Sequence, residues 1–236
     1  FGPAIQQAFG QIKQHLDPLN LLSPNRMVNP PKMDDTTLMR FPPRYKVVPI
    51  RTALDWSAWN VQNDPATEQT SAPGTGGDPA QGLAKAVEMC NNNGHCRKFD
   101  AGTMCPSYRV TWDEKHLTRG RANTLRLALS GQLDGLPAQD AFTSQAVHEA
   151  LDLCVGCKGC KRDCPTGVDM AKMKIEFLHH YKQKNGYTLG DRLVAHMPDY
   201  AAFASRWASA LNRLARLPGV AWLLERSVGI SARRSL

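Results

Sequence analysis

The chain has 236 residues, of which 42% are apolar and 7% aromatic, with 18 Gly, 16 Pro and a net charge of +8. This length allows one or two domains, and the many Gly and Pro residues argue against a single uninterrupted sandwich or barrel. No apolar run approaches the roughly 18 residues that a membrane-spanning helix needs, and no signal-peptide layout opens the chain. Because residue 1 is Phe rather than Met, we expect a piece of a longer polypeptide.

The first predicted element is an amphipathic helix over residues 3–17. Its apolar residues recur at three- and four-residue steps: Ile5, Phe9, Ile12 and Leu16. Pro3 suits the first turn, and Asp17-Pro18 ends the helix. The chain that follows, through the Pro42-Pro43 pair, is typical of extended segments and turns.

Residues 57–80 are rich in Pro, Gly, Ser and Thr, which predicts a flexible linker and a domain boundary. Residues 81–190 contain helical periodicity at 119–130, at 143–153 and from the N-cap Asp169 to Gly186. The apolar faces of these helices are Ala122, Leu125 and Leu129, then Val147, Ala150 and Leu151, then Met173, Phe177 and Tyr181. No alternating strand pattern appears, so this region should be mainly helical.

Residues 171–236 hold 11 Lys and Arg against 4 Asp and Glu, so most of the excess charge lies in the last quarter of the chain. One helical stripe is predicted there, formed by Phe203, Trp207, Leu211 and Leu214, with Pro218 ending or kinking the helix. A basic helix of this kind can meet nucleic acid, an anionic membrane or an acidic partner, or can present a solvated face.

All seven cysteines lie between residues 90 and 164. They form two groups: Cys90, Cys96 and Cys105, then Cys154, Cys157, Cys160 and Cys164. An odd number of clustered thiols without an export signal favours a reducing compartment and a metal over a disulfide scaffold. We therefore expect a cytoplasmic protein with a metal centre.

The second group reads Cys-x2-Cys-x2-Cys-x3-Cys-Pro from Cys154 to Pro165, which is the ferredoxin spacing for a [4Fe–4S] cluster. Three thiolates at three-residue steps can surround one iron–sulfur cube, and Gly156 and Gly159 let the backbone approach it. Zinc is the alternative metal, but structural zinc sites typically take their ligands as two separated pairs. The run therefore favours iron–sulfur chemistry.

The first group overlays on the second except at one position, where Asn93 replaces a cysteine. In two-cluster ferredoxins the last cysteine of each run ligates the other cluster. This rule assigns one complete [4Fe–4S] site, formed by Cys105, Cys154, Cys157 and Cys160. Cys90, Cys96 and Cys164 are left for a second site that is one ligand short. That site could hold a [3Fe–4S] cluster, a [4Fe–4S] cluster with His95 or Asn93 as a ligand, or no cluster.

The 49-residue separation between Cys105 and Cys154 is too long for a small β-rich ferredoxin, and the intervening segment has helical periodicity. We expect a mainly α fold, a helical ferredoxin with two cysteine motifs. No catalytic residue is assigned, because the histidines are scattered over predicted helices.

Residues 88–97 (EMCNNNGHCR), 102–108 (GTMCPSY) and 118–123 (TRGRAN) resemble the iron–sulfur module of bacterial FAD-linked D-2-hydroxy-acid dehydrogenases of the D-lactate, glycolate and D-2-hydroxyglutarate type. The second cysteine motif resembles the same module, which is similar to the helical ferredoxin of succinate dehydrogenase. Residues 1–3 and 12–26 resemble the closing helix and loop of an FAD-linked oxidase C-terminal domain.

The resemblance implies four parts. These are the end of an oxidase domain (1–56), the linker (57–80), the [4Fe–4S] ferredoxin-type domain (81–190) and a basic helical segment leading to a downstream cysteine-rich domain (191–236). The parent enzyme would oxidise a 2-hydroxy acid at FAD and pass electrons singly to a quinone or protein acceptor. No FAD contact is assigned to this chain, which would not be catalytic by itself.

Two other interpretations stay open. The first is a free-standing iron–sulfur subunit of a glycerol-3-phosphate or glycolate dehydrogenase complex, although the oxidase-like N-terminus argues against it. The second, a nucleic-acid partner, is disfavoured because the basic tail contains no recognisable binding module. The stripe from Phe203 to Leu214 could instead rest on the inner face of a membrane as a peripheral contact. Packing against the downstream domain is the interpretation that we favour.

Overall fold

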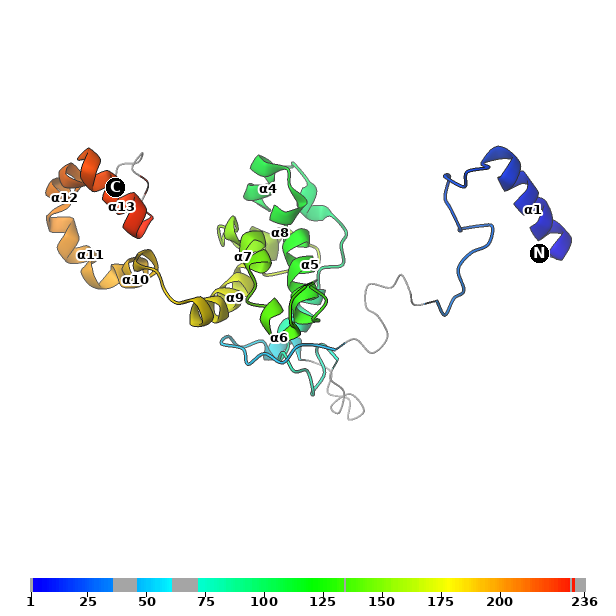
Figure 1. The fold of residues 1–236 in the computed structure, drawn as a ribbon, viewed down its shortest axis with the longest axis horizontal. Helices are drawn as coiled ribbons and strands as arrows, with labels where there is room; N and C mark the ends of the chain where they lie inside the picture. The colour runs from blue at the N-terminus through cyan, green and yellow to red at the C-terminus, as the bar shows by residue number, and fades with distance from the viewer. Residues whose placement is uncertain (1, 36–45, 61–71, 134, 230, 232–236) are drawn as a thin grey trace. The chain divides into compact units, whose positions relative to one another are not determined.

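The computed structural model describes residues 2–35, 46–60, 72–133, 135–229 and 231. The chain divides into two compact units, Phe1–Tyr45 and Lys46–Leu236. Regular structure in the described ranges is helical, and no β-strand occurs within them (Figure 1). The predicted mainly α fold is therefore confirmed.

The first unit contains α1 (Pro3–Leu16), which begins with Pro3 in its first turn and ends at Asp17, as predicted. The Asp17 carboxylate accepts hydrogen bonds from the backbone N–H groups of Leu21 and Leu22 at 2.9 and 2.8 Å. These bonds turn the chain sharply after the helix. No side chain of α1 is buried.

The second unit has a helical body in which α5 (Thr118–Leu129) contacts several other helices. The remaining helices of this body are α3 (Leu83–Glu88), α4 (Pro106–Thr111), α6 (Ala138–Ala141), α7 (Gln145–Asp152), α8 (Gly159–Asp163) and α9 (Met170–Asn185). Three short 3-10 turns accompany them: η1 (Ser57–Trp59), η2 (His95–Arg97) and η3 (Glu114–His116).

The predicted helices of this body are confirmed, with ends that lie within two residues of the predicted ones. The buried faces contain Leu125, Val147 and Phe177. Asp169 caps α9 by accepting the backbone N–H of Lys172 at 3.0 Å. The helix ends at Gly186, whose φ of +83° favours glycine.

Residues 46–56 lie on the helical body, although the sequence predicts that they belong with the oxidase-like N-terminal part. Val47 and Trp56 are buried. The backbone N–H groups of Val48 and Ile50 donate to the carbonyl oxygens of Leu129 and Pro79, at 2.7 and 3.1 Å. We call residues 46–56 the strap. Apolar burial and these long-range hydrogen bonds attach this extended segment to the helical body.

The linker predicted at 57–80 is wrong for residues 72–80, while 61–71 lie outside the described residues. Thr75, Asp78 and Ala80 are buried. The Asp78 carboxylate accepts the backbone N–H groups of Gly74, Ala80 and Gly82 at 2.9 to 3.0 Å. One carboxylate therefore orders a turn whose composition is typical of flexible chain.

The C-terminal part of the second unit contains α10 (Leu189–Ala195), α11 (Met197–Arg206), α12 (Ala208–Ala215) and α13 (Pro218–Val228). The single helix predicted through Phe203 and Leu214 is wrong, because Trp207 adopts φ −109° and ψ 12° and divides α11 from α12. Pro218 opens α13 rather than kinking a helix. The predicted stripe residues are all exposed, from 46% to 67%. Within the described ranges, no helix has the length and apolar character needed to cross a membrane.

Candidate metal centre

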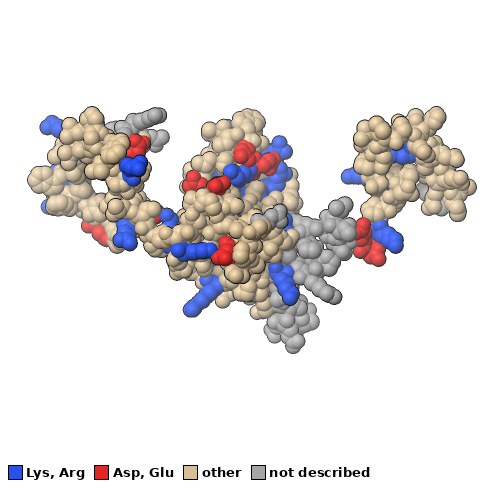
Figure 2. Space-filling view, viewed as in Figure 1, with Lys and Arg blue, Asp and Glu red and all other residues tan. Residues whose placement is uncertain are grey.

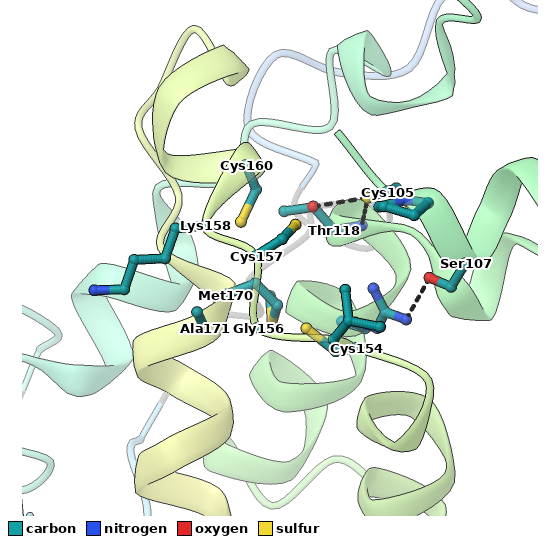
Figure 3. Close-up of a pocket in the computed structure, with 13 residues that line it drawn as sticks. Cys105, Ser107, Thr118, Cys154, Gly156, Cys157, Lys158, Cys160, Met170 and Ala171 are labelled. Atoms are coloured by element: carbon teal, nitrogen blue, oxygen red, sulfur yellow. Dashed lines mark hydrogen bonds between the residues drawn. The ribbon is translucent and has the colours of Figure 1, made fainter. Parts of the chain in front are cut away.

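One pocket of the helical body brings together four cysteines from two distant segments (Figure 3). Cys105 lies directly before α4, Cys154 and Cys157 lie on the loop after α7, and Cys160 lies in α8. The space around these cysteines that is free of protein atoms, including its opening to solvent, is about 330 Å³. Four thiol groups around one space form a soft donor set of the kind that holds an iron–sulfur cluster.

Cys105 is buried and is oriented by the first residue of α5. The backbone N–H of Thr118 donates to Cys105 Sγ at 3.0 Å, and Thr118 Oγ1 lies at 3.0 Å from the same sulfur. Cys105 itself has a φ of +53°, a left-handed conformation that is uncommon for a side-chain-bearing residue. Burial raises the pKa of its thiol, while the Thr118 hydrogen bonds and the Arg121 charge oppose that rise.

The two cysteine segments approach each other closely at Gly159. A Cβ at this position would lie 2.7 Å from Thr103 Oγ1 and 3.3 Å from the Thr103 carbonyl oxygen. The Asp163 carboxylate joins the same segments by accepting the backbone N–H of Thr103 at 2.8 Å and its hydroxyl at 3.1 Å. Gly159 thus permits the approach between segments, whereas the sequence interpretation assigned it to approach a cluster.

Helix α9 supports the other side of the pocket, which Met170 and Ala171 line. Burial raises the pKa of the Cys160 thiol, opposed by a hydrogen bond from the backbone N–H of Met170. Lys174 donates to the carbonyl oxygens of Asp152 and Cys154 at 3.0 and 2.7 Å, which holds the start of the cysteine loop against α9. Cys157 is exposed, so one side of the pocket faces the surface.

Arg121 also lines this pocket and is only 3% exposed. Its Nε donates to the carbonyl oxygen of Ala150 at 2.9 Å, and a terminal nitrogen donates to Ser107 Oγ at 2.9 Å. These bonds join α5 to α7 and α4. The sequence interpretation included Arg121 in a family-like segment without a role, because its burial depends on helices distant in sequence.

Two cysteines of the proposed second site lie near the beginning of α5. Burial raises the pKa of the Cys96 thiol to about 11, while the backbone N–H of Arg119 opposes this and the nearby Cys105 and Cys90 add to it. Cys90 is buried as well. Successive backbone groups of α5, at Thr118 and Arg119, therefore bond to Cys105 and Cys96, one cysteine from each expected site.

Cys164, the third cysteine expected in the second site, makes its hydrogen bonds within its own turn. Its Sγ lies 3.2 Å from Thr166 Oγ1. Burial raises the pKa of this thiol, but hydrogen bonds from Thr166, Val168 and Gly167 outweigh burial and lower it. In iron–sulfur proteins, hydrogen bonds to the sulfurs are among the factors that set the reduction potential. The first pocket does not include Cys90, Cys96 or Cys164.

Of the two candidates for a non-cysteine ligand, Asn93 is hydrogen-bonded within its own turn and His95 lines another pocket. Asn93 Oδ1 accepts the backbone N–H of His95 at 2.8 Å. His95 lines a separate pocket together with Lys98 and Asp163. Within the described part of the chain, no three Cys, His, Asp or Glu side chains are grouped closely enough to hold a single metal ion.

Acidic and basic side chains are interspersed over the face of the helical body drawn in Figure 2. Arg119 and Arg97 pair with Glu114 at 2.7 and 3.2 Å, and Lys184 pairs with Asp140 at 2.5 Å. These pairs balance part of the positive charge of the helical body.

The sequence of this chain is similar to that of known iron–sulfur proteins. Residues 86–168 match a family model described as a 4Fe-4S dicluster domain. D-2-hydroxyglutarate dehydrogenase of Escherichia coli (strain K12) is 26% identical over 261 residues, covering 98% of this chain and 23% of that protein. The enzyme of the same name from Pseudomonas putida is 31% identical over 163 residues, covering 52% of this chain and 16% of that protein.

A probable glycolate oxidase iron-sulfur subunit of Bacillus subtilis (strain 168) is 30% identical over 91 residues, covering 38% of this chain and 19% of that protein. The chain thus spans about a quarter or less of the length of these relatives. No solved structure matches it significantly. These matches confirm the resemblance to iron–sulfur modules of this type and support an electron-transfer role.

Proposed function

We propose that this chain is the electron-transfer part of an FAD-dependent 2-hydroxy-acid dehydrogenase, with a [4Fe–4S] cluster on Cys105, Cys154, Cys157 and Cys160. The observation that carries the proposal is the convergence of Cys105 on the cysteine run, 49 residues later in the chain, around one pocket. A bound cluster would supply a centre that accepts and donates one electron at a time.

The protein's own groups fit such a centre. The Thr118 and Met170 backbone N–H groups point at the thiols of Cys105 and Cys160, where they would stabilise negative charge on sulfur. Cys105 and Cys160 are buried, which excludes water from that side. Exposed Cys157 would face the flavin domain or another electron partner.

The cofactor, substrate and acceptor of the parent enzyme are inferred from the similar proteins. FAD would be held by another part of the parent protein, and D-2-hydroxyglutarate is the substrate named for two of the relatives. The acceptor would be a quinone or a protein, with the enzyme in the cytoplasm or peripheral on the inner face of the membrane. Cys90, Cys96 and Cys164 would bind a second cluster, in agreement with the name of the matched dicluster domain.

One observation favours a second candidate function. The Bacillus subtilis relative is named as an iron-sulfur subunit, which describes a separate polypeptide. In that case the chain would perform the same electron transfer as part of a complex rather than as part of a flavoprotein chain.

The test is iron, zinc and acid-labile sulfide per chain after anaerobic purification, with electron paramagnetic resonance (EPR) spectra before and after dithionite. We expect about four iron and four sulfide per cluster, hence about seven or eight of each if both sites bind clusters. Cys157→Ser should remove the signal of the first site, and the matched variant Cys164→Ser should leave it intact. Stoichiometric zinc without sulfide, persisting after anaerobic reconstitution, would refute the proposal.

A further inference from the structure

Arg121 carries a positive charge that is buried without a carboxylate. Its two described hydrogen-bond acceptors, the Ala150 carbonyl and the Ser107 hydroxyl, are neutral. None of the ion pairs found within the described ranges includes Arg121. An arginine side chain stays protonated in proteins. A neutral donor would satisfy the same two acceptors, so the hydrogen bonds do not account for the charge.

Burying an uncompensated charge costs free energy, which implies a negative partner in the same space. No acidic side chain is among the described residues that line the pocket. Asp169, whose charge acts on Cys160, pairs with Lys161 at 3.5 Å. The Lys158 side chain is exposed and points away from the four cysteines in Figure 3. The four thiols are therefore the groups that can balance Arg121, once they are ionised by a cluster.

We propose that Arg121 raises the reduction potential of the cluster bound by Cys105, Cys154, Cys157 and Cys160. This inference rests on the proposed function. One-electron reduction adds a negative charge to a centre that is already surrounded by four thiolates, and net charge is among the factors that set such potentials. A fixed cation in the low-dielectric interior stabilises the reduced form more than the oxidised form. Arg121 is thus a positioning charge rather than a ligand.

The test is an EPR-monitored redox titration of the anaerobically purified chain with three substitutions. Arg121→Met removes both charge and donors, Arg121→Gln removes the charge and keeps a donor, and Arg121→Lys keeps the charge. We expect Arg121→Met and Arg121→Gln to lower the ratio of reduced to oxidised cluster at least tenfold at a fixed ambient potential. A tenfold change corresponds to a shift of about 59 mV in the one-electron reduction potential. Arg121→Lys should lower this ratio less than threefold, because it keeps the charge.

Arg162→Met is the matched control, because it makes the same chemical change at a side chain that is 86% exposed. Its charge is screened by water, so its effect should stay below threefold. A tenfold effect in Arg162→Met, an unchanged ratio in Arg121→Met and Arg121→Gln, or equal shifts in Arg121→Lys and Arg121→Met would each overturn the inference. Loss of iron in all three Arg121 variants would also overturn it, because Lys retains the charge.

Different results would contradict the electron-transfer function and the role of Arg121. If the unsubstituted chain shows no dithionite-reducible signal that depends on Cys157, the proposed function itself is wrong. If that signal is present and its potential does not respond to Arg121, only the role of Arg121 is wrong.

Discussion

Gly159 shows how one residue controls the meeting of two distant cysteine segments. We predict that Gly159→Ala will destabilise the chain by about 1 to 3 kcal/mol, the usual cost of overpacking. The added Cβ would lie 2.7 Å from Thr103 Oγ1, so either Thr103 or the loop must move. The iron content of the purified protein should fall together with the free energy of unfolding, measured by chemical denaturation.

Gly219→Ala provides the control, because a Cβ there would meet no atom within 4 Å. It should change stability by less than about 0.5 kcal/mol. If the two alanine variants hold the same iron and unfold at the same denaturant concentration, the close approach at Gly159 has no role in forming the pocket.

At the scale of elements, Glu176 of α9 joins the strap to the helical body. Its fully buried carboxylate accepts the backbone N–H groups of Ala53 and Leu54 at 2.6 and 2.9 Å and the Trp56 indole N–H at 2.9 Å. His180 Nε2 lies 3.0 Å from the same carboxylate. Burial raises the pKa of Glu176, but these hydrogen bonds outweigh burial and lower it.

We predict that Glu176→Gln will lower the free energy of unfolding by about 1.5 to 3 kcal/mol, because an amide has one acceptor oxygen where the carboxylate has two. A lowered folded-state pKa means that the carboxylate's contribution is complete above the unfolded pKa and is lost only as the pH falls through the folded pKa. The deficit should therefore be complete at pH 7. Denaturation at that pH, with exposed Glu149→Gln as the control, measures it; equal effects of the two substitutions would contradict this account.

The helices could be predicted from sequence because their signals are local. Val147, Ala150 and Leu151 lie within α7, and Asp169 and Gly186 lie directly beside the two ends of α9. The strap and the turn around Asp78 could not be predicted from the sequence. Their conformations depend on contacts that the composition of these segments does not indicate. Ala53 and Glu176 are 123 positions apart.

The same distinction applies to the site. The regular spacing of the cysteine run, with Cys105 before a proline, predicts four residues that the structure brings to one pocket. The roles of Arg121 and Lys174 could not be predicted, because an arginine or lysine on a helix gives no sign that it will be buried or will hold a distant loop. The helix break at Trp207 could not be predicted either, because no Gly or Pro lies at that position.

At the scale of the whole chain, the boundary between the units lies after Tyr45 rather than at the Pro- and Gly-rich segment. The strap contributes Val47, Ile50 and Trp56 to the core of the second unit, with exposed fractions of 5%, 9% and 2%. Burying a large apolar side chain contributes about 1.5 to 3 kcal/mol, which is an upper estimate because unfolded chains are partly compact. The strap should therefore be required for the stability of the iron–sulfur domain.

Two truncated chains test this boundary. A chain of residues 46–236 should bind the same iron as the full chain and unfold at the same denaturant concentration, since it keeps every described contact of the strap. A chain of residues 57–236 loses three buried side chains and three of the four described partners of Glu176. It should lose at least about 4 kcal/mol of stability and most of its iron. Equal stability of the two truncated chains would move the boundary to residue 57, and comparable loss in both would show that the first unit supports the second.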